Sequence, residues 1–232
     1  MMKVFVINLD RDTSKLAFMD TQFKRLRIPY VRISGILGAG LSSVEYRASY
    51  SSFRWWCAIG RPVVPAEVGC ALSHYGIYRR MMPGEVVCVL EDDVILESEF
   101  LIRLKEVETF VDAQKPQVIL LSSHERARSG YGIVRSSTGM CTDGYVITQL
   151  AAQALLNANM PMQVPCDHWE RWVKKGLIEL YHALPTVVRQ NQKRFGSSTQ
   201  NSMVRVKDCS YPVKIIHKFK RSFGKALDWV LP

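Results

Sequence analysis

Short continuous apolar runs alternate along the chain with longer stretches in which apolar residues recur every three or four positions. The run at residues 4–9 is rich in β-branched residues and ends at charged residues, so it predicts a buried strand. Helical spacing follows from Ser14, the expected N-cap, up to Pro29, and residues 30–33 predict a second strand. A strand, a helix and a strand in this order indicate an open, mostly parallel α/β sheet.

The same patterns predict the remaining elements. We expect helices at 68–82, 100–110, 150–157 and 167–175, the last with Asp167 at its N-cap, and strands at 86–90, 118–121, 144–148 and 180–188. Two regions lack a sustained period. Residues 34–65 predict a long, partly ordered excursion that covers a site, and residues 122–140 predict a loop. Helices are expected on both faces of the sheet.

Length and composition indicate one ordinary globular domain with an appendage. The chain has 232 residues, of which 47% are hydrophobic and 22% charged, and this excludes a disordered or low-complexity protein. The net charge of +10 is concentrated in residues 189–225, which hold ten Lys or Arg and one acid, Asp208. We therefore divide the chain into a body, residues 1–195, and a basic tail, residues 196–232.

The tail has the pattern of a basic amphipathic helix over residues 215–231, which predicts docking on an anionic membrane surface. The alternative is a solvated helix packed on the body. Six cysteines without a C-x-x-C pair fit reduced thiols in a cytosol. The N-terminal apolar run is too short for a signal peptide, and no stretch approaches the length of a spanning helix, so any membrane contact is expected to be peripheral.

Three consecutive acids, Glu91, Asp92 and Asp93, stand between the apolar strand at 86–90 and the apolar residues 94–96. Adjacent like charges raise one another's pKa, so a cation is expected beside them. In open α/β sheets ligands collect beyond the carboxyl ends of strands, and carboxylate oxygens suit Mg²⁺ or Mn²⁺ bridging a diphosphate. The alternative is a solvated strand-to-turn junction.

Five segments in order over residues 3–195 carry a family resemblance: VINLDRD, EVGCALSHYGIYRRM, VCVLEDDVIL, TDGYVITQLAAQALL and the Pro165-Cys166-Asp167 step. Together they resemble glycosyltransferase family 25, the bacterial lipooligosaccharide galactosyltransferases, with the collagen galactosyltransferases as distant relatives. The resemblance implies a GT-A fold, a nucleotide-sugar donor and a divalent metal on an Asp-x-Asp-type motif. It covers most of the chain and is far more specific than any one segment.

The resemblance assigns roles to residues of this sequence. Glu91 and Asp93 are the expected ligands of Mn²⁺ or Mg²⁺, with Asp92 near the ribose or the sugar. The residues expected around the nucleotide sugar are Asn8, Leu9 and Arg11 after the first strand, Gly69, Ser73 and His74 on one helix, and Gln190 near the end of the body. Lys15 stands where the family usually has an arginine, so one bidentate contact is in doubt.

A general base must take the proton of the acceptor hydroxyl in an inverting transfer. Asp167 in the Pro-x-Asp step is the first candidate, with a plain N-cap as its alternative, and Asp143 is the reserve. His74 is interpreted as a hydrogen-bonded residue that orients the acids. His182 is a candidate third metal ligand, but its place in an apolar strand favours a packed histidine.

Four tryptophans have two interpretations. Trp55 and Trp56 could line an acceptor site, because sugars pack on indole rings. Trp169 and Trp172, spaced at i and i+3, are expected in the core.

The predicted function is therefore metal-dependent transfer of a hexose, galactose first, from a UDP-sugar to a lipooligosaccharide core, with inversion. The expected location is cytoplasmic, peripheral on the inner face of a bacterial inner membrane. UDP-glucose and UDP-N-acetylhexosamine remain alternative donors. A membrane- or glycan-binding module with a structural metal is the non-enzymatic alternative. No nucleic-acid partner is expected, because no reading motif is present and such binding would leave the acidic triplet unexplained.

Overall fold

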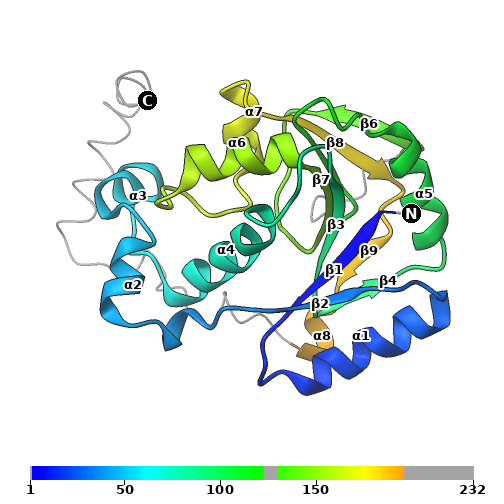
Figure 1. Ribbon diagram of the computed structural model, residues 1–232, viewed down its shortest axis with the longest axis horizontal. Helices are drawn as coiled ribbons and strands as arrows, with labels where there is room; N and C mark the ends of the chain where they lie inside the picture. The colour runs from blue at the N-terminus through cyan, green and yellow to red at the C-terminus, as the bar shows by residue number, and fades with distance from the viewer. Residues whose placement is uncertain (1, 123–129, 196–232) are drawn as a thin grey trace.

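A computed structural model describes residues 2–122 and 130–195, and the predicted basic tail lies outside the described residues. A seven-stranded sheet with the order β2-β1-β3-β7-β5-β8-β6 forms the centre (Figure 1). Its strands are β1 Lys3–Asn8, β2 Val31–Ser34, β3 Val86–Glu91, β5 Gln117–Leu120, β6 Gly132–Ser136, β7 Gly144–Thr148 and β8 Glu179–Leu184. Two further strands, β4 Val94–Leu96 and β9 Val188–Gln190, pair separately.

The sheet is mixed. Strands β2, β1 and β3 are parallel to one another, as are β5 and β8, whereas β7 runs antiparallel between β3 and β5 and β6 is antiparallel to β8. The α/β class is confirmed, and the mostly parallel expectation needs this correction. The connection before Asp143 brings the start of β7 to the end of β3, where the N–H of Glu91 donates to the carbonyl of Asp143, and β7 then runs back along β3.

Helices cover both faces of the sheet, as predicted (Figure 1). Side chains alternate along a strand, so Val87 and Val89 of β3 face one core and Cys88 and Leu90 the other. The first core is covered by α4 Pro65–Tyr78, α6 Gln149–Asn159 and α7 Trp169–Lys174, and the second by α1 Thr13–Leu26 and α5 Phe100–Phe110.

Three predicted boundaries are wrong. Helix α1 begins at Thr13 with Asp12 as N-cap, not at Ser14. Helix α7 has His168, not Asp167, as its N-cap. The single strand predicted at 180–188 is split into β8 and β9 around Pro185, which has no backbone N–H to donate to a ladder.

Residues 34–65 are more ordered than predicted. They contain a 3₁₀ turn, Gly38–Gly40, and two short helices, α2 Ser43–Ala48 and α3 Ser52–Ile59. A capping box between Ser42 and Glu45 starts α2. Helices of six and eight residues are too short to show a period in the sequence. Similarly, the loop predicted at 122–140 contains the edge strand β6.

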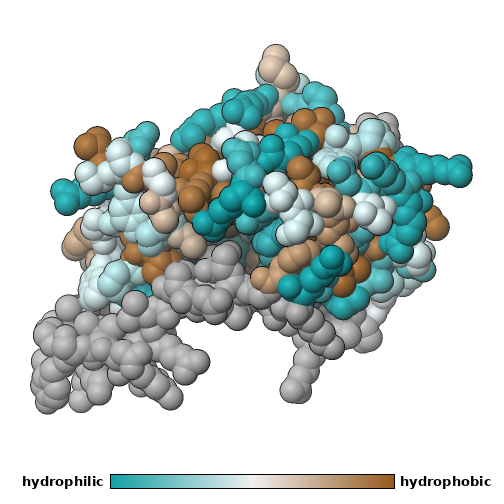
Figure 2. All heavy atoms as spheres, turned by 90° about the horizontal axis from the view of Figure 1, so that it is seen from below, coloured by the Kyte–Doolittle hydropathy of each residue, from teal (hydrophilic) through white to brown (hydrophobic). Residues whose placement is uncertain are grey.

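Hydrophilic and hydrophobic residues are interspersed on the face that Figure 2 shows from below. Among the described segments, none of the helices combines the length and the apolar composition that a membrane crossing requires. No disulfide links the five cysteines that the structure describes.

Candidate functional site

The carboxyl ends of β1, β2 and β3 lie together at one edge of the sheet, because these strands are parallel and in register from Ile7 opposite Glu91 to Asn8 opposite Ser34. A pocket opens at this edge, between the first turn of α1, residues 35–38, one face of α4 and the acidic triplet. The empty space in it, including the part open to solvent, is about 820 Å³.

Asp92 and Asp93 are both buried at this edge, and Lys15 from α1 lies between them. Its Nζ atom is 3.2 Å from Asp92 Oδ1 and 3.2 Å from Asp93 Oδ2. The other oxygen of Asp92 accepts a hydrogen bond of 2.7 Å from Asn8 Nδ2. Both oxygens of Asp92 therefore have partners, and its carboxylate is fixed.

Asp93 is different, because its Oδ1 atom is buried and has no hydrogen-bond partner among the described residues. Burial and, after it, the charge of Glu91 raise the pKa of Asp93 to about 6, although Lys15 lowers it. An unpaired carboxylate oxygen facing a pocket is costly unless a cation reaches it. The residues therefore fit the hard divalent cation that the sequence predicts, with Asp93 as its ligand.

Glu91 points toward α4. Its Oε1 atom accepts a hydrogen bond of 2.5 Å from Thr142 and lies 3.5 Å from His74 Nε2, while His74 Nδ1 is 2.8 Å from the hydroxyl of Tyr145. Burial lowers the pKa of His74, but Cys70 and Glu91 outweigh burial and raise it to about 9. The ring is thus an imidazolium paired with Glu91, as expected of a histidine that orients the acids.

Asn8 supports the site from below. Its Nδ2 atom donates to Asp92 and, at 3.0 Å, to the carbonyl of Asp12, and its Oδ1 atom accepts from Arg32 at 2.9 Å. Asn8 does not line the pocket, whereas Leu9 and Arg11 do. The predicted contact of Asn8 with a nucleotide is therefore replaced by a positioning role toward Asp92.

Gly69 and Ser73 hold a wall of the pocket in place. A Cβ atom on Gly69 would lie 2.4 Å from the carbonyl oxygen of Ile36, so only glycine permits this approach. Ser73 Oγ accepts from the N–H of Ile36 at 2.8 Å and donates to the carbonyl of Gly69 at 2.7 Å. Ser73 lines the pocket and Gly69 does not, so the predicted ligand role of Gly69 becomes one of packing residues 36–38 against α4.

Gly38→Ala is expected to destabilise the fold by about 3 kcal/mol and to lower the melting temperature by about 6–12 °C. Its Cβ atom would lie 1.7 Å from the carbonyl oxygen of Pro65, so residues 36–38 would have to leave α4. Gly40→Ala in the same turn is the control, because its Cβ atom meets nothing nearer than 3.9 Å. Thermal unfolding of both variants checks this, and equal melting temperatures would contradict the close approach.

Three further predicted site residues differ in burial and in whether they line the pocket: Gln190, Asp143 and Asp167. Gln190 lines the pocket from the end of β9, where the N–H of Asn191 donates to the carbonyl of Asp93 at 2.7 Å. Asp143 is buried at the start of β7 and does not line the pocket. Asp167 is half-buried, and its Oδ2 atom accepts from the N–H of Cys141 at 3.2 Å, leaving Oδ1 without a hydrogen bond in the part of the chain described here.

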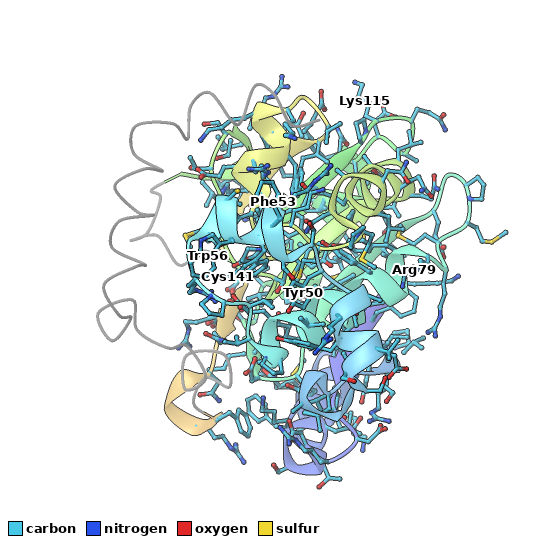
Figure 3. All side chains as sticks on the ribbon, turned by 90° about the vertical axis from the view of Figure 1, so that its left-hand side faces the viewer. Tyr50, Phe53, Trp56, Arg79, Lys115 and Cys141 are labelled. Carbon is cyan, nitrogen blue, oxygen red and sulfur yellow. The ribbon has the colours of Figure 1, made fainter. Side chains whose placement is uncertain are left out.

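The aromatic residues divide between core and surface. Trp169 and Trp172 are buried, as predicted, but Trp55 is also buried in the core and donates from Nε1 to the carbonyl of Arg61 at 3.0 Å. The acceptor-site interpretation therefore fails for Trp55. Figure 3 shows Trp56 and Phe53 of α3 on the side of the molecule turned to the viewer, with Trp56 half-buried and Phe53 exposed.

His182 lies in β8 away from the pocket, with Nε2 2.9 Å from the carbonyl of Thr138, so it is a packed histidine as predicted. The sequence does not indicate three partners of Glu91 or His74, which are Thr142, Tyr145 and Cys70, or the contact of Arg32 with Asn8. The sequence also does not show that Lys15 contacts both Asp92 and Asp93. No sequence signal marks these contacts, because they depend on how β7, β2 and α4 pack against β1 and β3.

Comparisons with known proteins agree with this architecture. A sequence model described as glycosyltransferase family 25 (LPS biosynthesis protein) matches residues 1–169. Procollagen galactosyltransferase 2 of Homo sapiens is 26% identical over 180 residues, which cover 68% of this chain and 28% of the relative. A probable inactive glycosyltransferase 25 family member 3 of Bos taurus is 32% identical over 190 residues, which cover 72% of this chain and 31% of the relative.

A viral protein is similar to about the same extent. The procollagen lysyl hydroxylase and glycosyltransferase of Acanthamoeba polyphaga mimivirus is 25% identical over 189 residues, covering 72% of this chain and 21% of the relative. The aligned regions thus make up between about a fifth and a third of these curated relatives.

Proposed function

The chain belongs to glycosyltransferase family 25, and on this premise we propose that it transfers a hexose, galactose first, from a UDP-sugar to an acceptor hydroxyl with the aid of Mn²⁺ or Mg²⁺. The observation that supports this most strongly is the buried Oδ1 atom of Asp93, which has no hydrogen-bond partner within residues 2–122 and 130–195 and lies in a pocket at the carboxyl edge of parallel strands. We further assign the mixed α/β sheet to the GT-A type.

Asp93 would hold the metal, with Asp92 beside it. A divalent cation there would bridge the diphosphate and neutralise the charge that develops as UDP leaves. Asp92 is held by Asn8 and Lys15, so it needs no rearrangement when the donor binds. Glu91, turned toward His74, is a ligand only if its free oxygen reaches the same cation.

The nucleotide sugar would lie between Leu9, Arg11 and Gln190. Arg11 is largely exposed at the rim, where a guanidinium can reach a phosphate. Lys15 stands deeper in the pocket, beside both aspartates, and supplies a point charge where the family usually has the planar fork of arginine. Ser73 and His74 form the opposite wall.

Asp167 is the favoured general base. Its Oδ1 atom has no hydrogen bond among the described residues, so it can accept the proton of an acceptor hydroxyl. Asp143 is buried, and its backbone carbonyl is tied to Glu91, which makes it the reserve. Inversion of the anomeric centre follows from a single displacement assisted by such a base.

Galactose and a lipooligosaccharide acceptor are inferred from names. The family description refers to LPS biosynthesis, and the relative from Homo sapiens is named a galactosyltransferase. UDP-glucose and UDP-N-acetylhexosamine remain alternative donors. The proposed cellular location is the inner face of a bacterial inner membrane. Because one relative is named probable inactive, turnover itself must be measured.

The test is release of UDP from a panel of UDP-sugars by the full chain, with Mn²⁺ and with a chelator. We expect UDP-galactose to give the fastest release, and only with the metal. Metal-dependent release from UDP-glucose or UDP-N-acetylhexosamine alone would change the donor. No release from any nucleotide sugar, with or without acceptor glycans, would overturn the proposed enzymatic function and favour a glycan-binding module.

Lys15→Met is expected to destabilise the metal-free protein by about 2–4 kcal/mol, because it leaves two buried carboxylates without their cation. Added Mn²⁺ should restore more of the melting temperature in this variant than in the native chain. The control is Lys3→Met, which removes an exposed pair with Glu85 and should change stability by less than about 1 kcal/mol. Thermal unfolding with and without Mn²⁺ checks this prediction. An equal rise in melting temperature on adding Mn²⁺ to the native chain, Lys15→Met and Lys3→Met would contradict it.

A further inference from the structure

A second group of potential metal ligands lies in the pocket, on the α4 side. Cys70 and His74 are four residues apart on α4, so they share one helix face, and Glu91 ends β3 opposite them. The sulfur, an imidazole nitrogen and a carboxylate oxygen of these residues all lie within 4.8 Å of one another. Cys70 has no part in the proposed transfer reaction, and His74 only lines the pocket there.

We propose that Cys70, His74 and Glu91, with the thiol of Cys166 as fourth donor, form a binding site for a thiolate-preferring divalent cation such as Zn²⁺. This site is separate from the hard-cation position proposed at Asp93, and it does not depend on the proposed transferase activity. Thiolate and imidazole ligands favour Zn²⁺, whereas carboxylates and water suit Mg²⁺ and Mn²⁺.

Two separations between donor atoms match the edges of a tetrahedral site. The sulfurs of Cys70 and Cys166 are 3.7 Å apart, and His74 Nε2 is 3.5 Å from Glu91 Oε1. Zinc bonds of about 2.3 Å to sulfur and about 2.1 Å to nitrogen or oxygen give tetrahedral edges of about 3.8 Å and about 3.4 Å. The protein thus already holds two pairs of donor atoms at the separations that Zn²⁺ requires.

Outer partners fix two of the ligands. The Nδ1 atom of His74 is 2.8 Å from the hydroxyl of Tyr145, which is itself 2.7 Å from the hydroxyl of Tyr78, so Nε2 is the nitrogen turned to the cluster. Thr142 donates to Glu91 Oε1 at 2.5 Å. Metal-binding histidines and carboxylates characteristically carry such hydrogen bonds, which orient them.

The site has an entry path and a rigid frame. Cys70, His74 and Glu91 all line the pocket, so an ion can reach them from solvent. Binding would release the thiol protons and the extra proton of His74 to water, while the cation replaces the imidazolium that now faces Glu91. Because Cys166 precedes Asp167 directly, an occupied site ties the proposed base to α4.

The experiment is a Co²⁺ titration of the full chain, purified free of metal and kept reduced with a phosphine. We expect one equivalent of Co²⁺ to produce a near-ultraviolet thiolate-to-cobalt band together with the visible bands of a tetrahedral ion. Zn²⁺ should remove both, and a large excess of Mg²⁺ should not. Cys70→Ser removes one of the two sulfur donors, so it should lower the thiolate band by at least about half and weaken Co²⁺ binding at least about tenfold.

Three comparisons separate this site from the proposed active site. Cys166→Ser should lower the thiolate band by about half, and Cys57→Ser, a half-buried cysteine of α3 outside the cluster, should leave it unchanged. Asp93→Asn should keep the band while losing Mn²⁺-dependent binding of UDP. A thiolate band that is absent from the native chain, keeps its full native intensity in Cys70→Ser or disappears in Asp93→Asn would overturn the proposal.

A measurement on the native chain covers the case in which Cys70→Ser fails to fold. Alkylation of Cys70 by iodoacetamide, followed by mass spectrometry, should slow at least about tenfold when one equivalent of Zn²⁺ is present, because the bound sulfur is no longer a free nucleophile. Mg²⁺ at the same concentration should have no effect. Equal labelling rates with and without Zn²⁺ would contradict the site.

Discussion

Asp93→Asn is expected to lower metal-dependent turnover of the UDP-sugar by at least about a thousandfold, which corresponds to about 4 kcal/mol of lost transition-state stabilisation. The carboxylate has one oxygen held by Lys15 and one buried oxygen that no other described residue hydrogen-bonds, so it offers a ligand position in the pocket wall. An amide in its place cannot neutralise a divalent cation. The measurement is the rate of UDP release at saturating Mn²⁺.

The same substitution should stabilise the protein when no metal is present. Burial, with help from Glu91, raises the pKa of Asp93 from 3.8 to about 6, so ionised Asp93 destabilises the folded state. A raised pKa contributes stability below about pH 4 that is lost as pH rises through about 6. Without metal, the free energy of unfolding of Asp93→Asn should therefore be about 1–3 kcal/mol higher than that of the native chain above pH 6. The two values should be equal near pH 4.

Glu97→Gln is the matched control, since it changes a partly exposed acid just after β4 that pairs only at the surface with Arg189. It should alter neither turnover nor stability by more than about 1 kcal/mol. Asp93 would not be the metal ligand if Asp93→Asn kept more than a tenth of the native turnover. Its ionised form would not destabilise the fold if Asp93→Asn lowered the metal-free stability above pH 6.

Asp167→Asn is expected to lower kcat for transfer by about 10²–10⁴, the range typical of a lost general base, with little change in the KM for the donor. The carboxylate accepts one backbone hydrogen bond from Cys141, and an amide oxygen can keep that bond, so the local structure should survive. Steady-state transfer kinetics with a glycan acceptor check the effect.

Asp143→Asn separates the two candidates for the base. Because Asp143 is buried and does not line the pocket, its substitution should mainly change stability. UDP binding in the presence of Mn²⁺ should remain within about twofold of native in Asp167→Asn, since Asp167 does not line the donor pocket. A large loss of kcat in Asp143→Asn with none in Asp167→Asn would exchange their roles.

Much of the fold follows from pattern alone. The helix at 100–110 and the strand at 144–148 have the predicted bounds. The short helices of residues 43–59 do not, since one turn and a half of helix shows no period. The direction of β7 was also hidden, because it depends on the long connection before Asp143 rather than on local residues.

The place of the site was predictable, and its internal contacts were not. The acidic triplet follows an apolar strand, so the strand-end rule puts it beside the end of β1. Which acid faces which partner depends on packing between distant segments. Asp92 meets Asn8 across the register of β1 and β3, and Glu91 meets His74 only because α4 crosses that edge.

Calorimetric titration of UDP into the full chain, with and without Mn²⁺, is the most direct test of the central claim. It asks whether the pocket at the carboxyl ends of β1, β2 and β3 binds a diphosphate through a divalent cation. We expect binding at least about tenfold tighter with Mn²⁺, and we expect this gain to vanish in Asp93→Asn while Glu97→Gln retains it. UDP affinity that is the same with and without Mn²⁺, or a Mn²⁺ effect that persists in Asp93→Asn, would contradict the account.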